Sequence, residues 1–131
     1  MILSYLIPKL EVHFAGHFHV SGTVVTFPEK HPAVGNVEVR DDGDELTLYA
    51  GNFTHLHFSN YDSSLSKAQA AETIADDAVA FLIKLFADGI VMWGSHCGRG
   101  GCYDREASPS STFSSKHGQE YVWSGPISKQ G

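Results

Sequence analysis

Cysteine and basic residues are both scarce in this chain of 131 residues. Cys97 and Cys102 are too few for the disulfide scaffold of a small secreted domain, so we expect free thiols or ligands rather than a disulfide. The nine Lys and Arg residues are scattered, which argues against a nucleic-acid-binding surface. No apolar run approaches the roughly 18 residues of a membrane helix. The apolar start lacks the basic segment and cleavage site of a signal peptide. These absences predict a cytoplasmic protein that binds neither nucleic acid nor membrane.

Recognisable catalytic motifs are missing as well. The sequence contains no G-x-S-x-G nucleophile elbow, no H-E-x-x-H zinc motif and no calcium-binding EF-hand loop. The composition, 42% hydrophobic and 18% charged, is that of a globular protein, and the length predicts a single domain over residues 1–131. The net charge of −6 suits either simple solubility or a basic protein partner. Together these features favour a binding role over catalysis.

One long helix is the clearest expected element. Ser66 and Gln69 have the spacing of a capping box, and apolar residues then recur on one face up to Leu85. Gly89 is the expected left-handed residue that ends this helix, which gives it the range 67–88. Carboxylates gather on the opposite face: Glu72, Asp76, Asp77 and Asp88. That acidic face is either an ordinary solvated surface or a docking face for a basic partner.

Alternating residues predict strands on both sides of this helix. A three-stranded antiparallel meander is expected over 37–40, 46–50 and 53–58, with a hairpin at Asp42-Gly43. A further hairpin is expected over 11–20 and 23–27. After the helix we expect a buried strand at 90–93, a return at 102–105 and a last strand at 120–123. The predicted fold is α+β, with a mostly antiparallel sheet of six or seven strands and one long helix packed across one face.

Histidines recur at alternate positions in two of these expected strands. His17 and His19 would share one face, as would His55 and His57, because residues two apart in a strand point to the same side. These four histidines could bind zinc, copper or nickel if the two strands were neighbours. A catalytic zinc would need a third ligand and an open position, and His13, Glu11 or Glu38 could supply that ligand. The alternative is a set of exposed imidazoles with no common ligand.

A glycine-rich turn follows the buried strand at 90–93. His96, Cys97 and Cys102 could hold zinc, but the spacing C-x4-C is not that of the usual zinc knuckle. Arg99 lies between glycines and could meet an anion, although the phosphate-loop pattern is absent. We interpret this segment mainly as a turn with incidental thiols, and retain Arg99 as a candidate binding residue.

Three short motifs resemble small bacterial proteins of unknown function: Gly51-Asn52-Phe53-Thr54-His55, Trp93-Gly94-Ser95 and Trp123-Ser124-Gly125-Pro126. The resemblance covers roughly residues 35–126. Some similar acidic α+β proteins are immunity proteins, which neutralise a cognate toxin. The resemblance implies a bacterial protein with a binding role, and it carries no site residue over to this chain.

Three functional hypotheses follow from these patterns. The leading one is a non-enzymatic, immunity-like binding protein whose partner surface includes Tyr49, Phe53, His55, His57 and Arg99. The second is a metal-binding protein or small metal-dependent hydrolase that uses His17, His19, His55 and His57. The third is a homodimer that buries the imidazole face and weakens below about pH 6, because clustered imidazolium groups repel one another.

Overall fold

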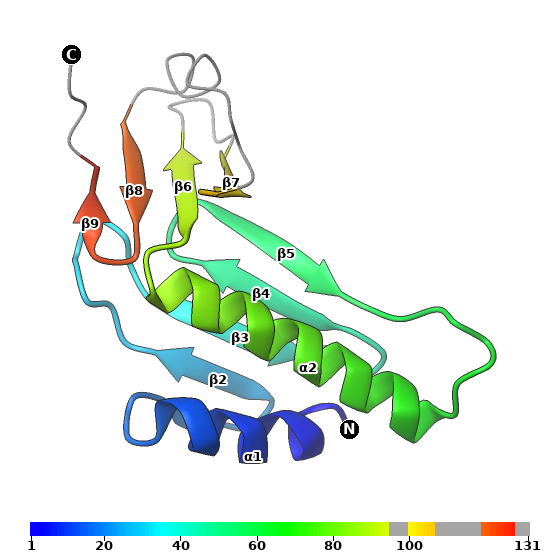
Figure 1. The fold of residues 1–131 in the computed structure, drawn as a ribbon. Helices are drawn as coiled ribbons and strands as arrows, with labels where there is room; N and C mark the ends of the chain where they lie inside the picture. Colours follow the sequence, from blue (N-terminus) through cyan, green and yellow to red (C-terminus); the bar gives the residue numbers. More distant parts are fainter. Residues whose placement is uncertain (95–99, 107–118, 128–131) are drawn as a thin grey trace.

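Two helices and nine strands make up the described part of the chain in a computed structural model, which describes residues 1–94, 100–106 and 119–127 (Figure 1). The elements follow in the order α1 (Leu3–Phe14), β1 (His19–Ser21), β2 (Val24–Phe27), β3 (Val37–Asp41), β4 (Leu46–Ala50), β5 (Thr54–Phe58), α2 (Lys67–Phe86), β6 (Ile90–Gly94), β7 (Gly100–Asp104), β8 (Glu120–Val122) and β9 (Gly125–Pro126). The predicted α+β class is confirmed.

The first sheet is an antiparallel meander in which every strand pairs with the next one along the chain, in the order β1-β2-β3-β4-β5. Val39 lies opposite Leu48, and Leu48 lies opposite Leu56, so these apolar side chains share one face. Val39 and Leu48 are fully buried. The predicted meander over β3, β4 and β5 is confirmed, and Gly43 adopts the positive φ of 99° that its hairpin turn requires.

Helix α2 packs across this apolar face. Ser66 and Gln69 form both hydrogen bonds of the predicted capping box, at 3.1 and 2.9 Å. The end of the helix differs from the prediction, because Asp88 and not Gly89 adopts the left-handed conformation, with φ 62°. The Asp88 carboxylate accepts hydrogen bonds from the Ser124 N–H at 3.0 Å and the Ser124 hydroxyl at 2.6 Å, and these contacts hold it there.

The N-terminal segment is the largest departure from prediction. The expected strand over 11–20 is wrong: residues 3–14 form α1, and within that range only His19 and Val20 belong to β1. Leu3, Leu6 and Leu10 have helical spacing and are buried, which explains why this segment is a helix. The Lys9 ammonium lies 2.9 Å from the Asp76 carboxylate and ties α1 to α2.

Strands β6 to β9 form a separate antiparallel sheet in the order β7-β6-β8-β9, so the single large sheet that we predicted is wrong. The two sheets meet where the Phe53 and Tyr121 rings stack, with centroids 4.8 Å apart. A Cβ at Gly100 would lie 1.7 Å from the Phe53 carbonyl oxygen, so only glycine allows this close approach. The predicted strands near 90–93, 102–105 and 120–123 are present in this second sheet.

One buried apolar cluster joins both helices and both sheets; it includes Leu6, Val39, Leu48, Leu82 and Met92. Figure 1 shows α1 and α2 lying side by side along the first sheet, so two helices, and not the one predicted, cover its inner face. The opposite face of that sheet carries polar side chains. Neither helix is long and apolar enough to cross a membrane.

Candidate functional site

The face of β3, β4 and β5 that points away from the helices presents six side chains, which we call the outer face: Glu38, Arg40, Thr47, Tyr49, His55 and His57. The strand register arranges them in two rows. Glu38 lies opposite Tyr49, which lies opposite His55; Arg40 lies opposite Thr47, which lies opposite His57. The sequence prediction that Tyr49, His55 and His57 share a face therefore agrees with the register.

Contacts within and between strands hold the side chains of the outer face in place. The Arg40 guanidinium lies over the Tyr49 ring, 5.0 Å from its centroid, and also 3.3 Å from the Glu38 carboxylate. The ring centroids of Tyr49 and His55 are 5.7 Å apart, and those of His55 and His57 are 5.2 Å apart. The Arg40–Tyr49 and Tyr49–His55 contacts join neighbouring strands, and each such cross-strand pair contributes about 0.2–1 kcal/mol. The side chains are therefore partly ordered before any partner binds.

His57 is oriented by groups at the adjacent hairpin. Its Nδ1 lies 3.0 Å from a Glu45 carboxylate oxygen and 3.2 Å from the Thr47 hydroxyl. The Thr47 hydroxyl donates its own proton to the Asp42 carboxylate, so it can accept one from Nδ1. Both contacts use Nδ1, and within the described residues Nε2 is the ring nitrogen available to a partner. His57 can therefore form a hydrogen bond to a partner through Nε2.

The structure separates the two histidine pairs. β1 and β5 are the opposite edges of the first sheet, so His19 is about 19 Å from β5 at the usual spacing between strands. His17 is not in a strand; its N–H bonds the Phe14 carbonyl at 2.9 Å in the turn after α1. A cluster that combines His17 and His19 with His55 and His57 is therefore not formed.

The predicted additional metal ligands are also dispersed. Glu11 and His13 lie on α1, and Glu38 lies on β3, two strands away from His55 and His57. Across residues 1–94, 100–106 and 119–127, no three His, Cys, Asp or Glu side chains gather into a group that could hold a metal ion. The geometry therefore lends no support to the metal hypothesis there.

The remaining candidate residues are either partly buried or outside the described part of the chain. Phe53 is half-buried between the two sheets against Tyr121, so it is not part of the outer face. Burial raises the pKa of the Cys102 thiol, which favours its unreactive protonated form. His96, Cys97 and Arg99 lie outside the described residues.

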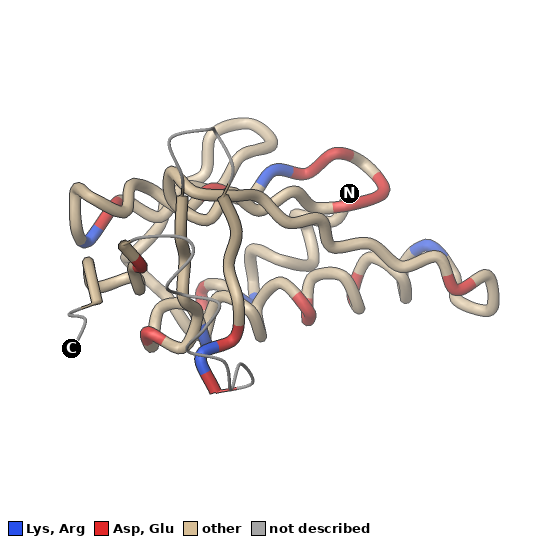
Figure 2. Tube along the Cα trace, turned by 90° about the horizontal axis from the view of Figure 1, so that it is seen from above, with Lys and Arg blue, Asp and Glu red and all other residues tan. Residues whose placement is uncertain are grey.

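The acidic face of α2 is largely engaged within the molecule. Lys9 contacts both Glu72 and Asp76, and Asp88 bonds Ser124. A second acidic group lies at the end of β3 and in the turn to β4, which we call the acidic turn: Asp41, Asp42, Asp44 and Glu45. Asp42 and Asp44 are exposed, while Asp41 and Glu45 are half-buried and bond the Leu3 N–H and His57, respectively. Figure 2 shows the acidic turn as a nearly continuous acidic run beside the N-terminus. The sequence contains this run, but we interpreted it only as a hairpin.

No family model, curated protein or solved structure matches the chain. The resemblance to small bacterial and immunity-like proteins therefore stays a prediction.

Proposed function

We propose that this protein is a non-enzymatic binding protein whose outer face and acidic turn dock a protein partner with a basic surface. The observation that carries the proposal is the ordered arrangement of Arg40, Tyr49 and His55 across three strands. Ordering side chains on association costs about 0.5–1.5 kcal/mol each, and part of that ordering already exists in the free protein.

The residue types on this face support protein recognition. Tyr and Arg are enriched among residues that dominate binding energy at protein interfaces. The Arg40 side chain is 50% exposed and the His57 side chain 53% exposed, so both are accessible on a face that the helices leave uncovered. The antiparallel register of β3 to β5 holds these groups in two rows.

Charge supports a basic partner. The four carboxylates of the acidic turn and Glu38 outweigh Arg40, which leaves this part of the surface acidic within a chain of net charge −6. Complementary charge increases the rate of encounter and disfavours acidic partners. We favour the acidic turn over the acidic face of α2 because it adjoins the outer face, where Glu45 lies 3.0 Å from His57. An immunity-like role, in which the partner is a toxin, is one form of this proposal.

The test is site-specific photo-crosslinking with matched positions. A photo-reactive phenylalanine analogue is placed at His55 on the outer face and, as the control, at the exposed Asp77 on α2. We expect a defined protein to crosslink at position 55 in cells of the source organism, and not at position 77. With that protein purified, Arg40→Ala combined with Tyr49→Ala should weaken binding about 100-fold or more in calorimetry, whereas Asp77→Lys should leave it within about threefold.

Two results would overturn the proposal. One is a purified partner that binds the double variant as tightly as the wild type, provided that circular dichroism shows both to be folded. The other is crosslinking at position 55 only to a second copy of the chain, together with a dimer in sedimentation, which would favour the homodimer hypothesis.

A further inference from the structure

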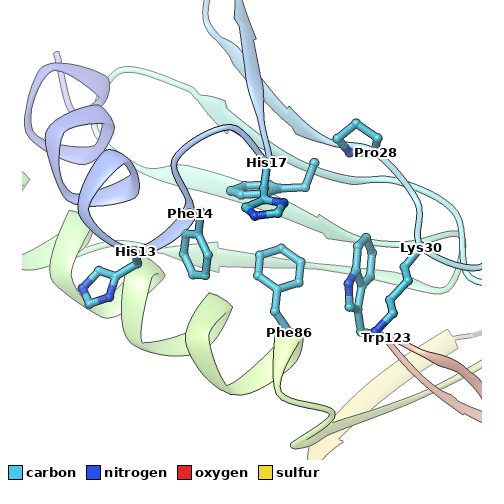
Figure 3. A pocket seen from close by; sticks show the side chains of 8 residues that line it. His13, Phe14, His17, Pro28, Lys30, Phe86 and Trp123 are labelled. Carbon is cyan, nitrogen blue, oxygen red and sulfur yellow. The ribbon is translucent and has the colours of Figure 1, made fainter.

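A pocket of about 430 Å³ opens where the C-terminal ends of both helices meet the end of β2 and the turn after β8 (Figure 3). It lies at α1 and α2, away from the outer face of β3, β4 and β5, and no step of the proposed function uses it. Small-molecule sites have volumes of roughly 300–1,000 Å³, so this pocket has room for one small ligand.

Aromatic rings form the wall of this pocket. Phe86 is central: its ring centroid lies 5.2 Å from that of Phe14, 4.9 Å from that of Phe27 and 4.9 Å from that of Trp123. The rings of Phe14 and Trp123 both meet Phe86 at steep angles, 82° and 64°. Tilted rings that pack on each other are fixed in position and present both faces and edges to the space between them. A flat apolar group would pack well against these rings.

The polar groups that line the pocket are basic in type. His13 comes from the end of α1, His17 from the turn that follows, and Lys30 from the segment after β2. No carboxylate is among the described lining residues. The Lys30 ammonium lies 3.5 Å from the Ser124 hydroxyl, which itself bonds the Asp88 carboxylate, so that carboxylate is already engaged. In a chain of net charge −6, this is a local surface that favours an anion.

The Trp123 side chain adds a directed hydrogen-bond donor. The residue is 8% exposed, and within the described residues no acceptor pairs with its indole N–H. Figure 3 shows the indole nitrogen on the side of the ring that faces Phe86 and the pocket. Buried polar groups without a partner are uncommon in folded proteins. An acceptor atom of a ligand in the pocket would supply the missing partner.

We infer that this pocket is a binding site for a small aromatic carboxylate. The aromatic part of the ligand packs against Phe86 and Trp123. Its carboxylate accepts hydrogen bonds from the Trp123 indole N–H and from the Lys30 ammonium. The His17 imidazole lies near Phe86, and the His13 imidazole lies at the other end of the lining, beyond Phe14 (Figure 3). A cationic ligand would be repelled by Lys30. A neutral aromatic compound would pack against the rings but form no ion pair with the Lys30 ammonium.

The test is calorimetric titration of the full chain with three compounds that share one ring system and differ in charge: 2-naphthoate, 2-naphthylmethanol and 2-naphthylmethylammonium. We expect 2-naphthoate to bind one site, about tenfold or more tightly than the alcohol, with the ammonium compound weakest. Lys30→Met and Trp123→Phe should each weaken 2-naphthoate about three- to tenfold. Lys67→Met removes an exposed lysine elsewhere on the surface and should leave the affinity unchanged.

Three outcomes would overturn the inference: no binding of 2-naphthoate at millimolar concentration, equal affinity for the acid and the alcohol, or an unchanged affinity in Lys30→Met. Lys30 is exposed, so its substitution tests the site even if Trp123→Phe perturbs folding. None of these outcomes depends on Arg40 or Tyr49, so the site at the helix ends and the proposed function fail or succeed separately.

Discussion

Asp88 shows how a single residue can decide the end of a helix. A left-handed conformation costs an L-residue about 1–2 kcal/mol, and glycine is its usual occupant. Here two hydrogen bonds from Ser124 to the Asp88 carboxylate compensate. The sequence predicted Gly89 in this role because local pattern cannot register a contact with a residue so far along the chain. The same bonds place the turn after β8 beside the end of α2.

Replacing Asp88 should therefore destabilise the protein. We expect Asp88→Ala to lower the free energy of unfolding by about 1–3 kcal/mol, since it removes both bonds and leaves alanine in the left-handed conformation. Urea denaturation measures this. In an Asp88→Ala background, Ser124→Ala should cost less than it does alone, because the two residues share the same bonds. Fully additive losses would contradict this account.

Tyr103 predicts a stability change at alkaline pH. Burial, together with its hydrogen bond to the Glu120 carboxylate at 2.6 Å, raises the pKa of Tyr103 from 10.0 to about 12. The fold thus favours the neutral phenol. This contribution to stability is complete below about pH 10, the pKa in the unfolded chain, and is lost as the pH rises towards 12. Between pH 9.5 and 11.5, urea denaturation should show a steeper loss of stability in the wild type than in Tyr103→Phe. Parallel curves would contradict the assignment.

The two helices differ in how far the sequence reveals them. α2 carries a capping box and a long apolar periodicity, and both signals were confirmed. α1 lacks a side-chain cap and contains Pro8. Its last residues also belong to the segment 11–20, in which the alternation of residues suggested a strand. Short segments of this kind satisfy more than one period. Packing of Leu6 and Leu10 against the rest of the core, which sequence pattern does not contain, decides in favour of the helix.

Alanine substitutions on the buried side of α1 should destabilise the protein more than those on its exposed side. Leu6 is fully buried, so Leu6→Ala should lower the free energy of unfolding by about 2–5 kcal/mol. Val12 is 79% exposed and serves as the matched control; Val12→Ala should change it by less than about 0.5 kcal/mol. Thermal or urea denaturation gives both values. Similar losses in the two variants would contradict the orientation of this helix.

At the scale of the whole molecule, the sequence predicted the strands better than their assembly. Tyr49, His55 and His57 share a face because alternation within a strand is a local property. Phe53 was grouped with them, but its surroundings are set by Tyr121 of the other sheet. The division into two sheets and the distance between the histidine pairs depend on strand order, which alternation does not encode.

The contact between Phe53 and Tyr121 predicts that both sheets unfold together. Trp93 and Trp123 report on the second sheet by fluorescence, and far-ultraviolet circular dichroism reports on the whole chain. In urea both signals should follow one transition. Phe53→Ala should lower its midpoint, with a cost of about 2–4 kcal/mol because the ring is half-buried, and should leave partner binding by the outer face intact. Two separate transitions in the wild type would contradict this prediction.

The order of strands in the first sheet also has a consequence for biosynthesis. Each of the four strands after β1 pairs with the strand made just before it, so the backbone hydrogen bonds of this sheet need no residue beyond Phe58. Its inner face, however, is completed only by α2, which ends at Phe86. A chain still growing on the ribosome therefore passes through an interval in which a paired sheet has only α1 over its apolar side. During that interval the exposed apolar face of the sheet can associate with other unfolded chains, so aggregation is the main risk at this stage of synthesis.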